Sequence, residues 1–365
     1  MYLFFRSLLF RLDPETAHQL TLQSIRFAGN FPPSNWLLTQ LYKSQSQPVQ
    51  AFGLTFKNPV GLAAGYDKNA VAVRGLSALG FGHVEVGTVT PKPQPGNPRP
   101  RVFRLLEDEA VINRMGFPGR GAAFMVKMLR GKPRKSLFQG GLFRLLLELT
   151  SKNPQLIPPA NRNQMILGIN LGKNKDTPNE EAVLDYLDLL QILAPYADYL
   201  AINISSPNTV GLRQLQGRAA LEGLLTQLDI QRKIEEKTLE KRIPLLVKLA
   251  PDLSESELNE AVDVILDTHM DGIIVTNTTI AREGLRSKYR EESGGLSGSP
   301  LRLRSEAALC QVLKRVDGKV PIVSVGGIMN PDDAKRRLDL GATLIQIYTG
   351  LIYQGPGLIK KILKH

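Results

Sequence analysis

The sequence predicts an α/β protein with the (β/α)8 TIM-barrel architecture, preceded by an N-terminal helical segment. Eight short runs of apolar and β-branched residues follow residue 46, and segments of helical length separate them. Amide, hydroxyl or ammonium side chains follow most of these runs, at the carboxyl ends of the strands where barrel enzymes place their active sites. The length of 365 residues accommodates one barrel of roughly 250 residues together with additional segments.

Residues 1–45 are predicted to form two or three short amphipathic helices, at 2–12, 15–28 and 35–42. Asp13-Pro14 and Pro32-Pro33 are typical helix starts. Apolar residues crowd the first helix, but no stretch approaches the roughly 20 apolar residues that a membrane crossing requires. We expect this segment to lie on a membrane rather than through it. The alternative is that the helices pack against one end of the barrel.

Residues 46–365 are predicted to form the barrel. Its eight strands are expected at 60–64, 83–86, 166–170, 199–204, 245–249, 272–276, 322–325 and 343–347. The interval between the second and third strands is too long for one crossover. It predicts a hairpin at 101–112, a helix, and a basic insertion at about 118–164.

The formal net charge of +12 is concentrated in this insertion, where nine basic residues stand against one acid, Glu148. Such an excess suits an anionic membrane surface, where each Lys or Arg contributes ~1 kcal/mol, at least as well as RNA. The insertion also contains the apolar run 142–147. We hypothesise a second amphipathic membrane contact and no nucleic-acid partner, with a solvated insertion that binds nothing as the alternative.

The single cysteine, Cys310, excludes a disulfide framework and a cysteine-rich metal cluster. Apolar residues recur at helical spacing in 304–316, so we predict a buried thiol in the core rather than a nucleophile. The sequence has no His or Glu cluster with metal-ligand spacing, no GxGxxG motif and no P-loop, so no metal is expected. The absence of a cleavable signal pattern favours a reducing cytoplasm for the catalytic part.

The strand ends supply a repeated set of polar side chains. In chain order these are Lys68, Thr88, Asn113, Asn170, Asn203, Lys248, Thr276, Asn277 and Thr278. Asparagine offers both a donor and an acceptor, so several asparagines on one face suit a planar, amide-rich ring such as a pyrimidine, and the lysines suit an anion. A single asparagine would more often cap a turn, but repetition at successive strand ends favours the ligand site.

Glycine turns follow the last two strands, at Gly326-Gly327 and Tyr348-Thr349-Gly350. In barrels of this class, backbone N–H groups in such turns and at a short helix hold a phosphate group. Gly298 is expected to join this site.

These residues resemble dihydroorotate dehydrogenase, specifically the class 2, quinone-dependent, membrane-associated branch. The resemblance covers nearly the whole chain from Asp13, apart from about 131–164. Its motifs are GLAAGYDK at 61–68, GTVTPKPQPGN at 87–97, NRMGF at 113–117 and NISSPN at 203–208. It implies oxidation of dihydroorotate to orotate in pyrimidine (UMP) biosynthesis, with FMN as bound cofactor and a membrane quinone as electron acceptor.

The resemblance also implies roles for individual residues. FMN would be bound by Ala64, Gly65, Tyr66, Asp67, Lys68, Thr88, Asn170, Asn203, Lys248, Thr276, Gly298, Gly327, Tyr348 and Thr349. Dihydroorotate would be bound by Lys68, Asn113, Arg114, Met115, Gly116, Phe117, Asn203, Asn208, Asn277 and Thr278. Ser206 would be the catalytic base, assisted by a proton relay because serine is intrinsically a poor base.

Two features assign the branch. The soluble class 1 enzymes use a cysteine base and lack N-terminal helices, whereas this chain has Ser206 and has the helices. The resemblance implies a hydrophobic quinone tunnel in the helical segment, with His18 and Arg101 near its inner end. It also implies a peripheral membrane protein on the cytoplasmic face of the cell membrane. The alternatives are a flavoprotein that reduces another pyrimidine-like ring, and a basic RNA-binding barrel with a vestigial flavin site.

Overall fold

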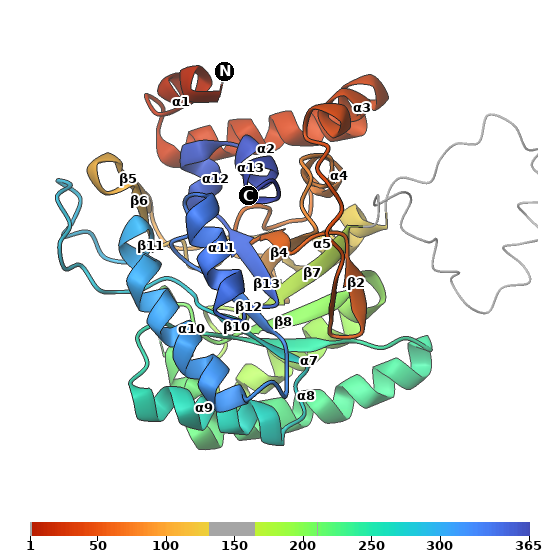
Figure 1. Ribbon diagram of the computed structural model, residues 1–365. Coiled ribbons are helices and arrows are strands. Elements are labelled where there is room, and N and C mark those ends of the chain that lie inside the picture. Colours follow the sequence, from red (N-terminus) through yellow and green to blue (C-terminus); the bar gives the residue numbers. More distant parts are fainter. Residues whose placement is uncertain (1, 131–164, 210) are drawn as a thin grey trace, which may run out of the picture.

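The computed structural model describes residues 2–130, 165–209 and 211–365, and it contains a closed barrel of eight parallel strands (Figure 1). The predicted basic insertion lies mostly outside the described residues. The barrel strands are β3 (Val60–Leu62), β4 (His83–Val89), β7 (Ile166–Leu171), β8 (Tyr199–Asn203), β9 (Leu245–Leu249), β10 (Gly272–Val275), β12 (Ile322–Val325) and β13 (Leu344–Ile347). Parallel pairing of β13 with β3 closes the barrel, so the predicted fold class is confirmed.

Helices surround the barrel. They are α4 (Val73–Ala78), α5 (Gly121–Leu129), α7 (Ala182–Leu193), α8 (Arg218–Leu239), α9 (Glu255–Asp267), α10 (Arg302–Val316), α11 (Pro331–Asp339), α12 (Thr349–Gln354) and α13 (Gly357–Ile362). Helix α9 begins at a capping box, in which Ser254 and Glu257 satisfy each other's backbone N–H groups. Each predicted strand overlaps an observed one, and the bounds differ by at most three residues.

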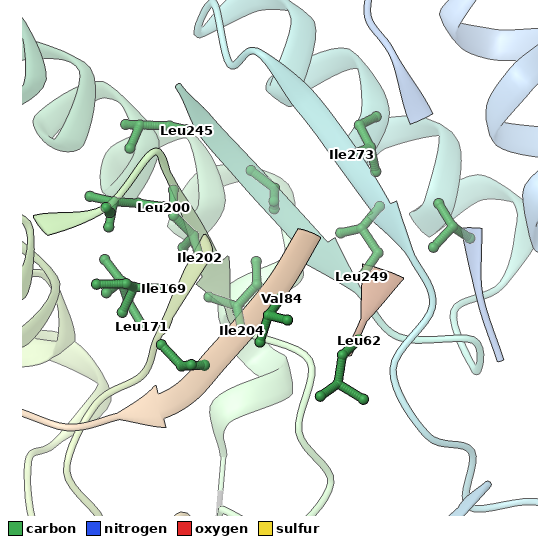
Figure 2. Packing of buried hydrophobic residues seen from close by; sticks show 14 of the residues in the cluster. Leu62, Val84, Ile169, Leu171, Leu200, Ile202, Ile204, Leu245, Leu249 and Ile273 are labelled. Atoms are coloured by element: carbon green, nitrogen blue, oxygen red, sulfur yellow. The ribbon is translucent and has the colours of Figure 1, made fainter. Parts of the chain in front are cut away.

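The main hydrophobic core fills the space between the strands and these helices. Figure 2 shows part of it, in which Ile169, Leu200 and Ile202 from neighbouring strands pack together without solvent exposure. A second cluster fills the barrel interior, and its Phe52 and Phe56 come from the hairpin of β1 (Val49–Ala51) and β2 (Leu54–Phe56). These rings contact the first residues of β4 and β8, so the hairpin covers the amino-terminal end of the barrel. The opposite end is left for the site.

The predicted hairpin at 101–112 forms as β5 (Val102–Leu105) and β6 (Ala110–Asn113). A third strand, β11 (Gly295–Gly298), joins it from a distant part of the chain. This sheet lies beside the carboxyl ends of the barrel strands and brings Asn113 and Gly298 to the same edge as the strand-end residues.

Three helices precede the barrel: α1 (Tyr2–Leu9), α2 (Pro14–Asn30) and α3 (Pro32–Leu41). Asp13 caps α2 by accepting hydrogen bonds from the N–H groups of Glu15 and Thr16, as its Asp-Pro start predicts. Helix α2 packs on α4, and the Tyr2 hydroxyl donates to the Ile352 carbonyl of α12 at 2.5 Å. The helices therefore lie together over one end of the barrel (Figure 1). Within the described ranges, every helix is too short or too polar to cross a bilayer.

The prediction of a buried Cys310 is wrong, because this residue is exposed on α10. The buried side of α10 is formed by Ser305, Glu306, Ala308, Leu309, Val312 and Val316. Position 310 follows Leu309 by one residue, which rotates its side chain by roughly 100° away from that side. The helical spacing was predicted correctly, but the face to which the cysteine belongs was not.

Candidate active site

A cavity of ≈ 780 Å³ extends from the carboxyl ends of the barrel strands to the N-terminal helices. Its inner part is lined by Thr88, Asn203, Lys248 and Thr276, which lie within two residues of the carboxyl ends of four strands. Its outer part is lined by apolar residues of α1, α2 and α3. The space is therefore polar at the barrel and apolar towards the helices.

Asn203, the last residue of β8, organises the polar end. Its amide nitrogen donates to Thr88 Oγ1 and to Asn170 Oδ1, each at 3.0 Å. Its amide oxygen accepts from Asn277 Nδ2 at 3.2 Å. These side chains come from four different strand ends, so closure of the barrel is what brings them together. The network fixes the orientation of amides facing the cavity.

Lys68 contributes a cation to the cavity wall. Its Nζ donates to the Gly65 carbonyl at 2.5 Å. Burial lowers the pKa of Lys68 to about 8, although the nearby Glu15 carboxylate opposes this shift. The side chain is thus held as a cation near neutral pH, beside the cavity, where it can attract an anionic ring or a carboxylate.

A second cation, Lys248, lies beneath the same end of the barrel. Burial lowers the pKa of Lys248, and the Glu85 carboxylate 3.9 Å from its Nζ opposes this. Glu85 is fully buried and accepts hydrogen bonds from Asn170, Tyr199 and Gln346. A buried carboxylate with three donors and an adjacent ammonium is well compensated, so Glu85 anchors this layer of the barrel interior.

Ser206 lies in the loop after β8, with its side chain at the cavity wall. Only 5% of the residue is exposed, and its Oγ accepts a hydrogen bond from the Asn208 backbone N–H at 3.2 Å. Asn208 Nδ2 donates in turn to Asn113 Oδ1 at 3.3 Å. Ser206, Asn208 and Asn113 therefore line one part of the cavity together.

Three glycine-containing segments meet at another wall of the cavity. Gly327 has a φ of +71°, and a Cβ atom there would lie 2.3 Å from Arg302 Cα. Gly298 has a φ of +98°, and a Cβ atom there would lie 2.3 Å from the Glu109 carbonyl oxygen. Thr349 Oγ1 donates to Ser297 Oγ at 2.9 Å and joins the start of α12 to β11. Glycine is required at both turns.

At the helical side, His18 of α2 lies edge-on to the Tyr66 ring, with the two ring centres 4.9 Å apart. Burial lowers the pKa of His18 to about 4, and the charge of Lys68 adds to this effect, so the imidazole is neutral at physiological pH. Glu15 of the same helix pairs with Arg101 at 2.7 Å. Although burial raises the pKa of Glu15, its bonds to Arg101 and the charges of Arg101 and Arg99 hold that pKa below its ordinary value.

Most of the residues predicted for the site line this one cavity. From the predicted flavin set these are Ala64, Gly65, Tyr66, Lys68, Thr88, Asn203, Lys248, Thr276, Gly298, Gly327, Tyr348 and Thr349. From the predicted substrate set they are Lys68, Asn113, Met115, Gly116, Phe117, Asn203, Asn208, Asn277 and Thr278. Ser206 and His18 line it as well.

Four residues that were predicted for the site do not line the cavity but lie behind its wall. The Asp67 carboxylate accepts from the backbone N–H groups of Val71 and Ala72, so it holds the loop that carries Lys68. Asn170 bonds to Glu85 and Thr88.

The other two are arginines. The Arg114 guanidinium turns outward to Glu292. The Arg101 guanidinium is bound by Glu15 and by the carbonyls of Pro95 and Asn97. Arg101 thereby holds Glu15, which lines the cavity.

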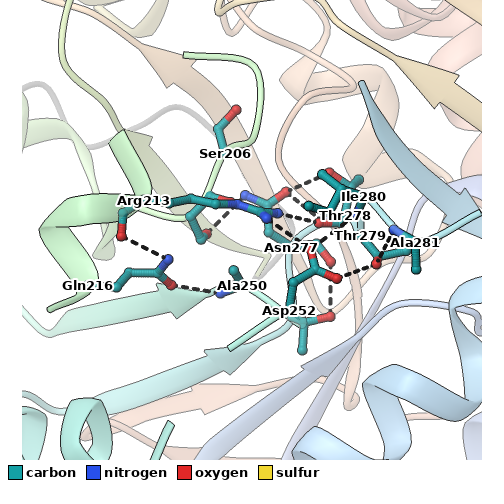
Figure 3. A network of polar contacts seen from close by, with 12 residues as sticks. Ser206, Arg213, Gln216, Ala250, Asp252, Asn277, Thr278, Thr279, Ile280 and Ala281 are labelled. Atoms are coloured by element: carbon teal, nitrogen blue, oxygen red, sulfur yellow. Dashed lines mark hydrogen bonds and ion pairs between the residues drawn. The ribbon is translucent and has the colours of Figure 1, made fainter. Parts of the chain in front are cut away.

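Sequence reasoning missed three residues that organise the site. Arg213, in the 3-10 turn Leu212–Gln216, donates to the carbonyls of Ser205 and Thr278 and to the Asp252 carboxylate (Figure 3). Glu85 could have been noticed as a charged residue inside an otherwise apolar strand. Arg213 and Asp252 carry no comparable local signal, because their partners are 8 to 65 residues away.

Comparisons of the sequence and of the structure with known proteins find relatives of one family. The family model described as "Dihydroorotate dehydrogenase" matches residues 47–365. "Dihydroorotate dehydrogenase (quinone)" of Idiomarina loihiensis is 45% identical over 370 residues, covering 100% of both chains. The protein of the same name from Cronobacter sakazakii is 46% identical, covering 100% of this chain and 99% of the relative. Ligand-free type DHODH from Eimeria tenella superimposes with a TM-score of 0.78 at 38% identity, covering 96% of this chain and 93% of that one.

Proposed function

This chain belongs to the dihydroorotate dehydrogenase family, and from that premise we propose that it oxidises dihydroorotate to orotate and passes the electrons to a quinone. The reaction supplies orotate for pyrimidine (UMP) biosynthesis. The observation that carries the proposal is the continuous cavity, polar where it meets the barrel strands and apolar where it meets α1 and α2. A polar, anionic substrate and an apolar acceptor can thus approach a shared redox group from different directions.

The residues present fit a flavin, and we assign FMN. A cavity of ≈ 780 Å³ accommodates a three-ring cofactor. Thr88, Lys248 and Asn203 offer a hydroxyl, an ammonium and an amide to the polar edge of the rings. The turns at Gly298 and Gly327, with the start of α12 at Thr349, bring backbone N–H groups to a phosphate. Bound there, FMN would supply the acceptor for a hydride from the substrate and the route by which the electrons pass to the quinone.

The substrate residues lie around Ser206. Asn113, Asn208 and Asn277 present amides that match the polar edges of a pyrimidine ring. Lys68 supplies a positive charge for the substrate carboxylate and stabilises negative charge that develops as a proton leaves. Ser206 Oγ takes that proton. As Oγ accepts that proton, Ser206 releases its own hydroxyl proton into a relay that leads away from the substrate, and the Asn208 N–H that donates to Oγ holds the oxygen in place.

The helical side serves the acceptor and the membrane. Residues of α1 to α3 form the apolar walls, with the neutral His18 at the inner end and Arg101 fixing Glu15 of α2. Large apolar side chains remain exposed on these helices, among them Phe4, Phe5, Leu20, Phe27 and Trp36. We assign residues 1–45 to peripheral contact with the cytoplasmic face of the cell membrane, from which quinone enters. The basic insertion at about 118–164 is assigned to the same anionic surface.

The test follows each half of the reaction separately. Anaerobic addition of dihydroorotate to purified protein should bleach the flavin absorbance, and a ubiquinone analogue should restore it. Absence of bound flavin would favour the RNA-binding alternative. Flavin that is bleached by another pyrimidine-like ring but not by dihydroorotate would contradict the assigned substrate.

A further inference from the structure

A second, smaller pocket of ≈ 460 Å³ lies between α2 and α5, and we call it the α2–α5 pocket. Its lining includes the basic side chains of Arg26, Arg120 and Lys127. Leu22 and Met128 contribute apolar surface to the same lining. The flavin cavity lies along other residues of α2, which include Ala17, Thr21 and Ile25. The two cavities therefore flank a single helix.

Among the described residues, no carboxylate compensates the charge of the α2–α5 pocket. Its lining contains no acidic residue, and none of its three cations pairs with a carboxylate of the described residues. The Arg120 guanidinium lies over the Phe124 ring, with its central carbon 3.7 Å from the ring centre. Arg26 Nη1 donates only weakly, to Gln23 Oε1 at 3.4 Å. Three neighbouring cations repel one another, so an anion bound among them relieves that repulsion.

The position of the pocket on α2 indicates where the anion comes from. Leu20 and Phe27 are 51% and 71% exposed. They follow the pocket residues Gln19 and Arg26 by one position, so they project roughly 100° around the helix from them. If Leu20 and Phe27 insert into the apolar layer of a membrane, the headgroup layer of that membrane therefore lies beside the basic side chains of the α2–α5 pocket.

We propose that the α2–α5 pocket binds the phosphate of an anionic phospholipid headgroup. The inference rests on the proposed membrane association and adds a headgroup site to it. Arg26 and Lys127 contact the phosphate from either side of the pocket, and Arg120, which lies over the Phe124 ring, supplies the third charge. Because the flavin cavity flanks the same helix, a headgroup bound here also orients the mouth of that cavity towards the lipid.

Sedimentation of the flavin-loaded full-length protein with vesicles tests the proposal. Phosphatidylcholine vesicles measure apolar insertion alone, and mixed phosphatidylcholine–phosphatidylglycerol vesicles add the anionic headgroup. We expect the parent protein to prefer the mixed vesicles. Arg26→Gln with Lys127→Gln should weaken binding to mixed vesicles by roughly 25-fold, about fivefold for each charge, and leave binding to neutral vesicles unchanged.

The matched control removes two exposed lysines elsewhere, Lys237→Gln on α8 and Lys314→Gln on α10, and should leave the preference intact. Equal losses of binding to mixed vesicles in the two double variants would overturn the proposed headgroup site, since only the net charge of the protein would then matter. Failure of the parent to bind any vesicle would instead contradict the proposed membrane association. A third outcome is that glycerol 3-phosphate raises the melting temperature of the parent protein but not that of the Arg26→Gln, Lys127→Gln variant, while the parent shows no preference for anionic vesicles. This outcome would contradict the lipid headgroup and assign the pocket to a soluble phosphate ester.

Discussion

At the residue scale, the proposed chemistry depends on how Ser206 is held. Its Oγ accepts from the Asn208 backbone N–H, and both residues line the cavity with Asn113. An ordinary serine hydroxyl binds a proton weakly, so its usefulness as a base comes from position and from the charges around it. Lys68, with a pKa lowered to about 8 by burial, is one of the cations that line the same cavity.

Replacement of Ser206 by alanine tests this role. We expect anaerobic flavin reduction by dihydroorotate to slow by much more than tenfold at neutral pH, with flavin still bound, because Ser206 lines the cavity beside Asn208 and Asn113, in the part that we assign to the substrate. Stopped-flow absorbance measures the rate, and the flavin-to-protein ratio provides the control. A rate within about tenfold of the parent, equivalent to ~1.4 kcal/mol, would mean that another group takes the proton.

At the element scale, the loops that follow β8, β9 and β10 are tied by Arg213. Its guanidinium donates to the Ser205 carbonyl at 3.2 Å, to Asp252 Oδ2 at 2.9 Å and to the Thr278 carbonyl at 3.0 Å (Figure 3). Ser205 precedes Ser206, and Thr278 lines the substrate part of the cavity. Arg213 is therefore a positioning residue for both.

Arg213→Lys should lower kcat/KM for dihydroorotate by roughly 10- to 100-fold, because a lysine ammonium cannot reach three acceptors in the geometry of a guanidinium. The flavin-to-protein ratio should not change, which separates loss of positioning from loss of the cofactor. Arg218→Ala, at an exposed position five residues away, is the control and should behave as the parent. An unchanged kcat/KM in Arg213→Lys would refute the positioning role.

The apolar path between α2 and the barrel makes a separate prediction. Ala28 lines the flavin cavity on the helical side, so Ala28→Trp should fill part of the path. We expect reoxidation of the flavin by a ubiquinone analogue to slow by at least tenfold, while flavin reduction by dihydroorotate keeps its rate. Gln40→Trp, at an exposed position of α3 outside the cavity lining, is the matched control. Equal slowing of both half-reactions would show that the two ligands share one approach.

At the scale of the whole molecule, the barrel interior determines how stability depends on pH. His83 is fully buried at the start of β4, and burial lowers its pKa from 6.5 to about 3. Between pH 6.5 and about 3 the unfolded chain therefore binds a proton at this residue that the folded chain does not bind. Stability falls as the pH decreases through this window and is unaffected by His83 above it.

Urea unfolding at several pH values measures this effect. The parent should lose up to ~1.4 kcal/mol of unfolding free energy per pH unit for this one proton, in addition to the contributions of other groups. His83→Gln is neutral throughout, so its pH slope between 6 and 4 should be smaller, whatever its absolute stability. Identical slopes in the two proteins would mean that His83 titrates in the folded state near its ordinary pKa.

Features that depend on neighbouring residues could be predicted from the amino-acid sequence. The alternation of strand-like and helix-like segments predicted the barrel, and the polar residues after most of the strand-like runs predicted the site, because the carboxyl ends of parallel strands lie at one edge. The hairpin at 101–112 and the start of α2 at Asp13-Pro14 were predicted for the same reason. Each of these signals lies within a few residues.

Features that depend on contacts between distant parts of the chain could be seen only in the folded structure. Three such features involve segments that meet only when the barrel closes. They are the hydrogen bonds of Arg213, the burial of Glu85 among Asn170, Tyr199 and Gln346, and the α2–α5 pocket. The exposure of Cys310 likewise depends on how α10 is rotated against the barrel. The spacing of apolar residues along the sequence predicts a helix, but it does not determine which side of the helix faces the core. Hydrophobic burial over the whole barrel determines that rotation.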